Sequence, residues 1–127
     1  MDRPLLGRSI LVVEDEPIIA MDVARKLDAA GASVLVARTL SDALVEVETP
    51  DLSAGVVDHR LSDGDASQVC SRLDARNIPF VIYSGYNHVT GPCSEGEHLR
   101  KPVPPDVLVG TLVDLLLDRE VRGQRAT

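Results

Sequence analysis

Short, continuous apolar runs are spaced along the chain, and they alternate with longer segments in which apolar residues recur every three or four positions. Runs of the first kind, bounded by turn residues, are typical of strands buried on both faces of a parallel sheet. Spacing of the second kind is typical of helices that cover such a sheet. The pattern therefore predicts five strands, placed at residues 10–13, 33–38, 56–57, 80–83 and 98–100.

Proline, threonine and glycine residues mark the ends of the predicted helices. Pro17 suits the first position of a helix, and Gly31 is expected to end that helix. Thr39 is expected to cap the second helix, and Pro104-Pro105 to open the last one. The third helix carries an apolar stripe made of Ala66, Val69, Cys70 and Leu73. The section from Gly85 to Glu97 has no apolar period, so at most a single helical turn fits there.

This alternation predicts an α/β fold. Right-handed crossovers restrict it to a doubly wound parallel sheet, and five strands favour the flavodoxin-like order 2-1-3-4-5, here with a shortened fourth helix. The topological switch point then lies between the first and third strands. We expect a single domain over residues 1–127, with a core at about 8–118 and a charged tail at 119–127 that frays.

Composition narrows the class of protein. A formal net charge of −7, with no Trp, one Phe and two Tyr, argues against nucleic acid as a direct partner. No apolar span is long enough for a membrane helix, and the N-terminus lacks the apolar region of a signal peptide. Cys70 and Cys93 suggest no disulfide framework, because Cys70 falls on a buried helix stripe and Cys93 in a polar loop. A reduced cytoplasmic protein is the simplest account.

Polar residues follow four of the predicted strands. They are Glu14 and Asp15 after the first strand, Asp58 after the third, Ser84 after the fourth and Lys101 after the fifth. In an open parallel sheet these ends meet at one edge, which is where ligands bind. Three neighbouring carboxylates need a proton or a cation, and oxygen ligands on short loops suit Mg²⁺. An Asp carboxylate can act as a nucleophile toward a phosphoryl group, with the cation and Lys101 supplying charge and Ser84 a donor.

Each of these signals also has an ordinary reading. Acidic residues after a strand often only start a helix, and an Asp such as Asp58 is often a turn residue. Ser84-Gly85 is an ordinary turn, and Lys101 before a proline is often only a solvated charge. Their joint placement on four strand ends favours a site.

The residues together resemble a bacterial response-regulator receiver domain of two-component phosphorelays, over residues 8 to about 118. The resemblance implies that Glu14 and Asp15 bind Mg²⁺ and that Asp58 accepts the phosphoryl group. The backbone carbonyl of Arg60 would complete the metal shell. Ser84 would be the switch hydroxyl, and Lys101 the lysine that precedes a proline.

Several positions depart from the pattern of that family. Glu14 replaces the commoner Asp, Ser62 stands where a proline is usual, and His98 replaces the aromatic switch residue three positions before the lysine. The stretch Phe80–Tyr86 resembles a subgroup of mostly stand-alone proteobacterial receivers with a Phe-x-x-Thr-Gly-Tyr sequence. We expect Tyr86 and His98 to form the switch and partner surface.

The resemblance implies a single-domain response regulator that is a phosphoacceptor rather than an enzyme. A sensor histidine kinase or a histidine phosphotransfer protein would be its donor, with no nucleic acid or membrane partner. It would signal through an unidentified downstream protein or act as a phosphoryl shuttle or sink. The alternatives are a degenerate receiver that binds partners without phosphorylation, and a phosphatase of the haloacid-dehalogenase type. The latter needs a second acid two residues after Asp58, where Arg60 stands.

A zinc site is a further alternative. His88, Cys93 and His98 are spaced five residues apart, but this spacing fits no standard structural zinc site and a fourth ligand is missing.

Overall fold

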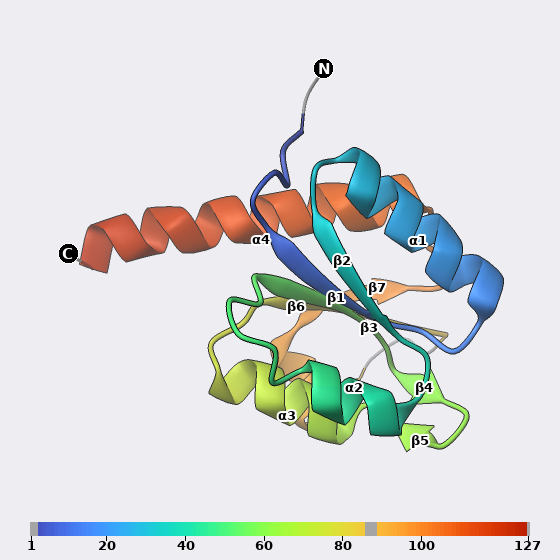
Figure 1. The fold of residues 1–127 in the computed structure, drawn as a ribbon. Coiled ribbons are helices and arrows are strands. Elements are labelled where there is room, and N and C mark those ends of the chain that lie inside the picture. Colours follow the sequence, from blue (N-terminus) through green and yellow to red (C-terminus); the bar gives the residue numbers. More distant parts are fainter. Residues whose placement is uncertain (1–2, 86–88, 127) are drawn as a thin grey trace.

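Five parallel strands form one sheet in the computed structural model, which describes residues 3–85 and 89–126. The strands are β1 (Ser9–Val13), β2 (Ser33–Ala37), β3 (Ala54–Asp58), β6 (Phe80–Ser84) and β7 (Glu97–Arg100). Their order in the sheet is β2-β1-β3-β6-β7 (Figure 1). Counted along the chain this is 2-1-3-4-5, so the predicted flavodoxin-like fold is confirmed.

Helices cover both faces of the sheet. Helices α1 (Pro17–Ala29) and α4 (Pro105–Ala126) lie on one face, and α2 (Leu40–Glu46) and α3 (Ser67–Ala75) lie on the other (Figure 1). A small hairpin of β4 (Arg60–Leu61) and β5 (Gly64–Asp65) follows β3, and the pattern of apolar residues did not predict it. Helix α4 continues through the charged residues beyond position 118, and none of the described helices is both long and apolar enough to cross a membrane.

Two apolar cores lie on the two faces, because successive strand side chains point in opposite directions. On β1, Leu11 and Val13 pack toward α2 and α3, whereas Ile10 and Val12 pack toward α1 and α4. Every residue of β3 and of β6 is buried. This explains why these strands appear in the sequence as continuous apolar runs rather than as alternating patterns.

The helices begin and end at the proline, threonine and glycine residues that the sequence predicted as their ends. Pro17 is the first residue of α1, and the Thr39 hydroxyl accepts a hydrogen bond from the Asp42 backbone N–H at 3.0 Å, capping α2. Gly31 follows α1 with a φ of +103°, and a Cβ there would lie 2.9 Å from the Leu6 backbone nitrogen. Only glycine meets both requirements at this turn.

At the place of the predicted shortened fourth helix, the structure has η1 (Gly91–Glu95), a 3₁₀ turn between β6 and β7. Gly96 ends it under the Phe80 ring, where a Cβ would lie 2.9 Å from the Phe80 carbonyl oxygen and closer still to the ring. The expectation of a shortened fourth helix is therefore confirmed.

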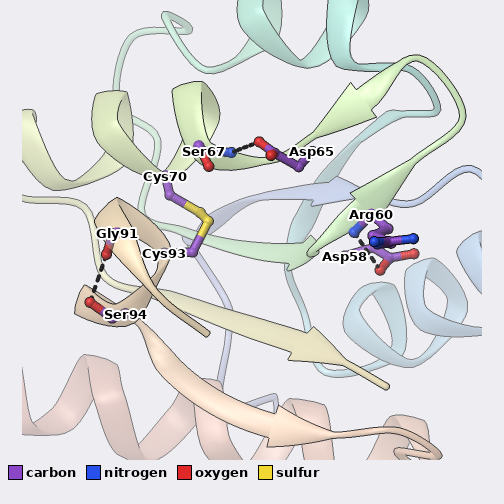
Figure 2. Close-up of a disulfide and its surroundings, with 8 residues drawn as sticks. All are labelled: Asp58, Arg60, Asp65, Ser67, Cys70, Gly91, Cys93 and Ser94. Atoms are coloured by element: carbon purple, nitrogen blue, oxygen red, sulfur yellow. Dashed lines mark hydrogen bonds between the residues drawn. A yellow bond between two sulfur atoms is a disulfide. The ribbon is translucent and has the colours of Figure 1, made fainter. Parts of the chain in front are cut away.

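The expectation for the cysteines is wrong. Cys70 on α3 and Cys93 on η1 are both completely buried, their Cα atoms lie 5.0 Å apart, and they form a disulfide (Figure 2). The two residues are 23 positions apart, and only the packing of η1 against α3 brings them together. Composition alone cannot reveal such a contact, so the argument from reduced cysteines to the cytoplasm loses its support.

Candidate functional site

Glu14, Asp58 and Tyr83 lie side by side at the ends of three neighbouring strands. Val13 on β1 is in register with Val57 on β3, which places Glu14 next to Asp58, and Asp58 is in register with Tyr83 on β6. The strand alternation points all three side chains toward the face that α1 and α4 cover. The predicted meeting of strand ends thus occurs, and it occurs between β1 and β3, at the switch point of the sheet.

Both oxygens of the Asp58 carboxylate accept hydrogen bonds, and the residue is only 3% exposed. Its Oδ1 accepts a hydrogen bond from the Arg60 backbone N–H at 3.2 Å, as Figure 2 shows, and its Oδ2 accepts one from Lys101 Nζ at 3.1 Å. The Lys101 backbone N–H donates to the Ser84 carbonyl at 2.7 Å. This contact joins the end of β7 to the end of β6 and so sets where the Lys101 side chain begins.

The Glu14 carboxylate is completely buried, and each of its oxygens accepts a hydrogen bond. Oε1 accepts one from the Tyr83 hydroxyl at 2.6 Å, and Oε2 accepts one from the Glu16 backbone N–H at 3.0 Å. Burial raises the pKa of Glu14 to about 7; the charge of Asp58 also raises it, and the two hydrogen bonds oppose the rise. Burial likewise raises the pKa of Tyr83, so its phenol remains a neutral donor.

Three carboxylates are close enough to hold one cation. Glu14, Asp15 and Asp58 each offer an oxygen, and these oxygens all lie within 4.8 Å of one another. Glu14 and Asp58 are buried, and Asp15 is half-buried. An all-oxygen set with a partly accessible member fits a hard divalent cation that keeps some of its waters.

A cavity of about 270 Å³ adjoins the Asp58 carboxylate. Its lining includes His59, Ser84 and Gly85, together with Lys101. Ser84 is 2% exposed, so its side chain belongs to the wall of this cavity and not to the outer surface. The structure thus brings Ser84, Lys101 and Asp58 around one space, as their positions on the strand ends predicted.

Other predicted positions lie elsewhere or outside the described residues. His98 lies on β7 in register with Ile82, which points it toward the α2 and α3 face, away from Glu14. It is half-buried, and its Nε2 is buried with no hydrogen-bond partner among the described residues. Tyr86 and His88 lie outside the described residues. Cys93 is in the disulfide and offers no thiolate, so the zinc alternative fails.

The apolar pattern placed Tyr83 in a buried strand and predicted no role for it in the site. Its hydroxyl reaches Glu14, and its ring lies under Lys101, with Nζ 5.2 Å from the ring centroid. The position of Tyr83 in a fully buried strand could have indicated this contact, because a buried tyrosine hydroxyl needs a hydrogen-bond partner.

The chain is similar to a bacterial regulatory protein and to solved receiver domains. No protein-family model matches the chain. It is 25% identical over 121 residues to the acid tolerance regulatory protein ActR of Rhizobium meliloti (strain 1021), covering 88% of this chain but only 62% of that protein. It is 26% identical to the receiver domain of the Francisella response regulator 1452, with a TM-score of 0.76 and coverage of 90% of this chain and 99% of that one.

The fold has a further match. A CheY-like response regulator receiver domain protein from Methanospirillum hungatei JF-1 superposes with a TM-score of 0.81 at 20% identity, covering 91% of this chain and 98% of that one. With the strand order and the residues at the strand ends, these similarities show that the chain has the CheY-like fold and that a response-regulator receiver domain fits it.

Proposed function

We propose that this receiver domain is a magnesium-dependent phosphoacceptor and that Asp58 takes the phosphoryl group of a phosphohistidine. The observation that carries the proposal is the Asp58 carboxylate itself. It is buried, held 3.1 Å from the Lys101 ammonium, and grouped with two further carboxylates around a common point. Such an arrangement supplies a fixed oxygen nucleophile together with the positive charge that phosphoryl transfer needs.

The transfer requires one bond to form and one to break. An oxygen of Asp58 attacks phosphorus while the bond between phosphorus and the donor imidazole breaks. The electron pair returns to the imidazole, which takes up a proton from water, and Asp58 becomes an acyl phosphate. Mg²⁺ held by Glu14, Asp15 and Asp58, with the predicted Arg60 carbonyl, supplies charge neutralisation at the phosphoryl oxygens when it is bound.

The residues around the cavity have distinct roles in this proposal. The Lys101 ammonium exchanges its contact with Asp58 Oδ2 for a phosphoryl oxygen. Ser84, in the cavity wall, donates its hydroxyl to another phosphoryl oxygen and so reports the new group to the end of β6. Arg60 places a backbone N–H near Asp58, and no second acid stands at that position. This favours an acceptor over a hydrolase.

A groove next to the site suits the phosphohistidine donor, a histidine kinase or a phosphotransfer protein. A cavity of about 460 Å³ between α1 and the start of α4 is lined mostly by apolar residues, together with Asp22 and Lys101. Lys101 also lines the cavity at Asp58. Ile19, on α1, lines this groove and is 40% exposed. Because the donor must bring its imidazole to Asp58, we infer that its apolar helix surface covers this face.

The kinase of such a pathway uses ATP, so a cytoplasmic location is part of the proposal. The downstream partner is part of it too, either a protein that binds the phosphorylated form or a second phosphotransfer protein that drains it.

Labelling with a small phosphoryl donor tests the function directly. We expect acetyl phosphate with Mg²⁺ to add one phosphoryl group, measured by intact mass and removed by alkali. Asp58→Asn should abolish the addition. Asp63→Asn is the matched control, because Asp63 lies in the same loop but accepts hydrogen bonds from the Leu40 and Ser41 N–H groups instead. Equal labelling of the Asp58→Asn protein would contradict the proposal.

The groove has its own test. Ile19→Asp should slow labelling by a purified phosphorylated histidine phosphotransfer protein while leaving labelling by acetyl phosphate unchanged. If both donors are affected alike, the groove is not the donor surface.

Phosphorylation-independent binding is the second candidate function. The raised pKa of Glu14 favours it, because a protonated Glu14 leaves the acidic cluster with less charge to attract a cation near neutral pH. A wild-type protein that binds no Mg²⁺ at millimolar concentrations and takes no label would establish this candidate in place of the first.

A further inference from the structure

The Tyr83 side chain crosses the strand that carries the phosphoacceptor. It begins on β6, whereas its hydroxyl contact, Glu14, follows β1, and β3 lies between them. Neighbouring strands are about 4.8 Å apart, so the side chain spans a distance that few other residues could cover. It ends 2.6 Å from Glu14 Oε1, and its ring lies under the Lys101 ammonium on the way.

We propose that Tyr83 is a positioning residue of the phosphoacceptor site, whose hydroxyl orients the Glu14 carboxylate for the cation and whose ring supports the Lys101 ammonium. This inference rests on the proposed function. The Tyr83 hydroxyl acts on Glu14, which lies beside Asp58, and the Tyr83 ring acts on Lys101, which donates a hydrogen bond to Asp58.

The hydroxyl task follows from the length of Glu14. A glutamate has one more rotatable bond than an aspartate, so its carboxylate needs an additional constraint to stay in a ligand position. Here the Tyr83 hydroxyl holds Oε1 and the Glu16 N–H holds Oε2, while each oxygen keeps a second lone pair for a cation. Groups that hydrogen-bond a metal ligand in this way orient it, and their loss typically weakens metal binding about 10-fold to 100-fold.

The ring task follows from the placement of Lys101. Its ammonium donates to Asp58 Oδ2, and the Tyr83 ring lies 5.2 Å away on another side. A cation over an aromatic face is attracted by the ring electrons, most strongly where water is partly excluded. The ring therefore favours the position from which the ammonium can reach both the carboxylate and the space beside it.

A purely structural role is the competing account of Tyr83. A buried tyrosine needs a partner for its hydroxyl, and Glu14 would then be only that partner. The two accounts differ in what they predict for magnesium, because a packing role changes stability without changing the affinity of the folded protein for the cation.

Two substitutions separate the two tasks. Tyr83→Phe keeps the ring and removes the hydroxyl, whereas Tyr83→Leu removes both. We expect Tyr83→Phe to weaken Mg²⁺ binding about tenfold in calorimetry, while its acetyl phosphate labelling rate at saturating Mg²⁺ falls much less. Tyr83→Leu should lower both the affinity and that rate. Ile82→Val is the control, because Ile82 is on the same strand but faces the other core.

A double-mutant comparison tests whether Tyr83 acts through Glu14. In a Glu14→Ala background, which removes the acceptor oxygen, Tyr83→Phe should have no further effect on Mg²⁺ affinity. In an Asp15→Asn background its tenfold effect should persist. Circular dichroism establishes whether each variant is folded. If Tyr83→Leu does not fold, the Mg²⁺ affinity and the labelling rate of Tyr83→Phe are sufficient to test the role of the hydroxyl.

The outcomes distinguish this inference from the proposed function. If wild type binds Mg²⁺ and is labelled, but Tyr83→Phe binds Mg²⁺ as tightly, the positioning role is wrong and the phosphoacceptor remains. An equal loss in the Glu14→Ala background overturns the route through Glu14. If wild type neither binds Mg²⁺ nor takes label, the proposed function fails, and the positioning role fails with it.

Discussion

The acidic edge and the segment around η1 are held in different ways. The acidic edge lies at the ends of β1, β3 and β6 on the side that α1 and α4 cover, whereas η1 packs on the side of α2 and α3. At the edge, the strand register brings together two side-chain hydrogen bonds, one from Tyr83 to Glu14 and one from Lys101 to Asp58. At η1, a five-residue turn is tied to α3 by the Cys70–Cys93 disulfide. The edge therefore depends on the sheet, and η1 depends on a covalent link.

This difference implies that the two regions respond to different perturbations. Changes of pH and of cation concentration act on the carboxylates at the edge. Reducing agents act on η1. If the two regions are independent, each perturbation should leave the other region unchanged.

Loss of the disulfide should have the largest effect on stability. Cys70→Ser, Cys93→Ser and reduced wild-type protein should each lose about 3 kcal/mol of unfolding free energy, the usual size for a loop of this length. Urea unfolding with and without a reducing agent measures it, and the reducing agent should have no effect on either variant. The Mg²⁺ affinity should not change, and an affinity that falls in parallel would show that the edge and η1 are coupled.

The stability of the metal-free protein should fall as pH rises from about 5 to about 7.5. The pKa of Glu14 is 4.5 in the unfolded chain and about 7 in the folded one, so between these values the folded protein binds more protons. Its stability is then greatest at the low end of this window, and the difference is at most about 3 kcal/mol. Carboxylates with lowered pKa values, such as Asp63 and Asp65, act in the opposite sense but below this window.

Urea unfolding across this range measures the pH effect, and Glu14→Gln is the informative variant. It cannot ionise, so its stability should change little over the same window. A wild-type protein with a flat profile would mean that Glu14 is already ionised in the folded state at low pH. Reduction of the disulfide should shift the whole profile without changing its slope.

Substitution of Gly96 tests the η1 side without touching a cysteine. Gly96→Ala places a Cβ against the Phe80 ring and 2.9 Å from the Phe80 carbonyl. Overpacking of this kind costs about 2 kcal/mol. Gly85→Ala is the matched control, because a Cβ at Gly85 meets nothing within 4 Å. Thermal unfolding of the two variants should differ accordingly, and equal midpoints would contradict this packing.

Much of the fold and of the acidic edge could be predicted, because both depend on local rules. Strand runs, the Pro17 start and the Thr39 cap act within a few residues, and the ends of parallel strands must meet at one edge. The disulfide and the Tyr83 contact could not be predicted in this way. Each joins residues from distant elements, 23 positions apart for the cysteines and 69 for Tyr83 and Glu14. Their pairing depends on how the elements pack.

The smallest expected effect concerns how phosphorylation at the edge reaches η1. Residues 85–97 have no apolar period, which would favour a loop that becomes ordered on phosphorylation. The structure supplies an anchor, because Cys93 is completely buried and bonded to Cys70. We therefore expect only small changes in amide exchange at η1 when beryllofluoride, a phosphoryl mimic, is added with Mg²⁺.

The larger part of that response should lie on β7. His98 is half-buried on the face toward α2 and α3, and the Ser84 carbonyl is bonded to the Lys101 N–H at the end of this strand. Movement of Ser84 toward the mimic is thus passed to β7 through the backbone. Amide exchange should slow at residues 97–101, and reduction of the disulfide should extend the slowing to residues 91–95 by freeing η1 to move. If reduced protein shows no wider change than oxidised protein, the disulfide does not limit the response.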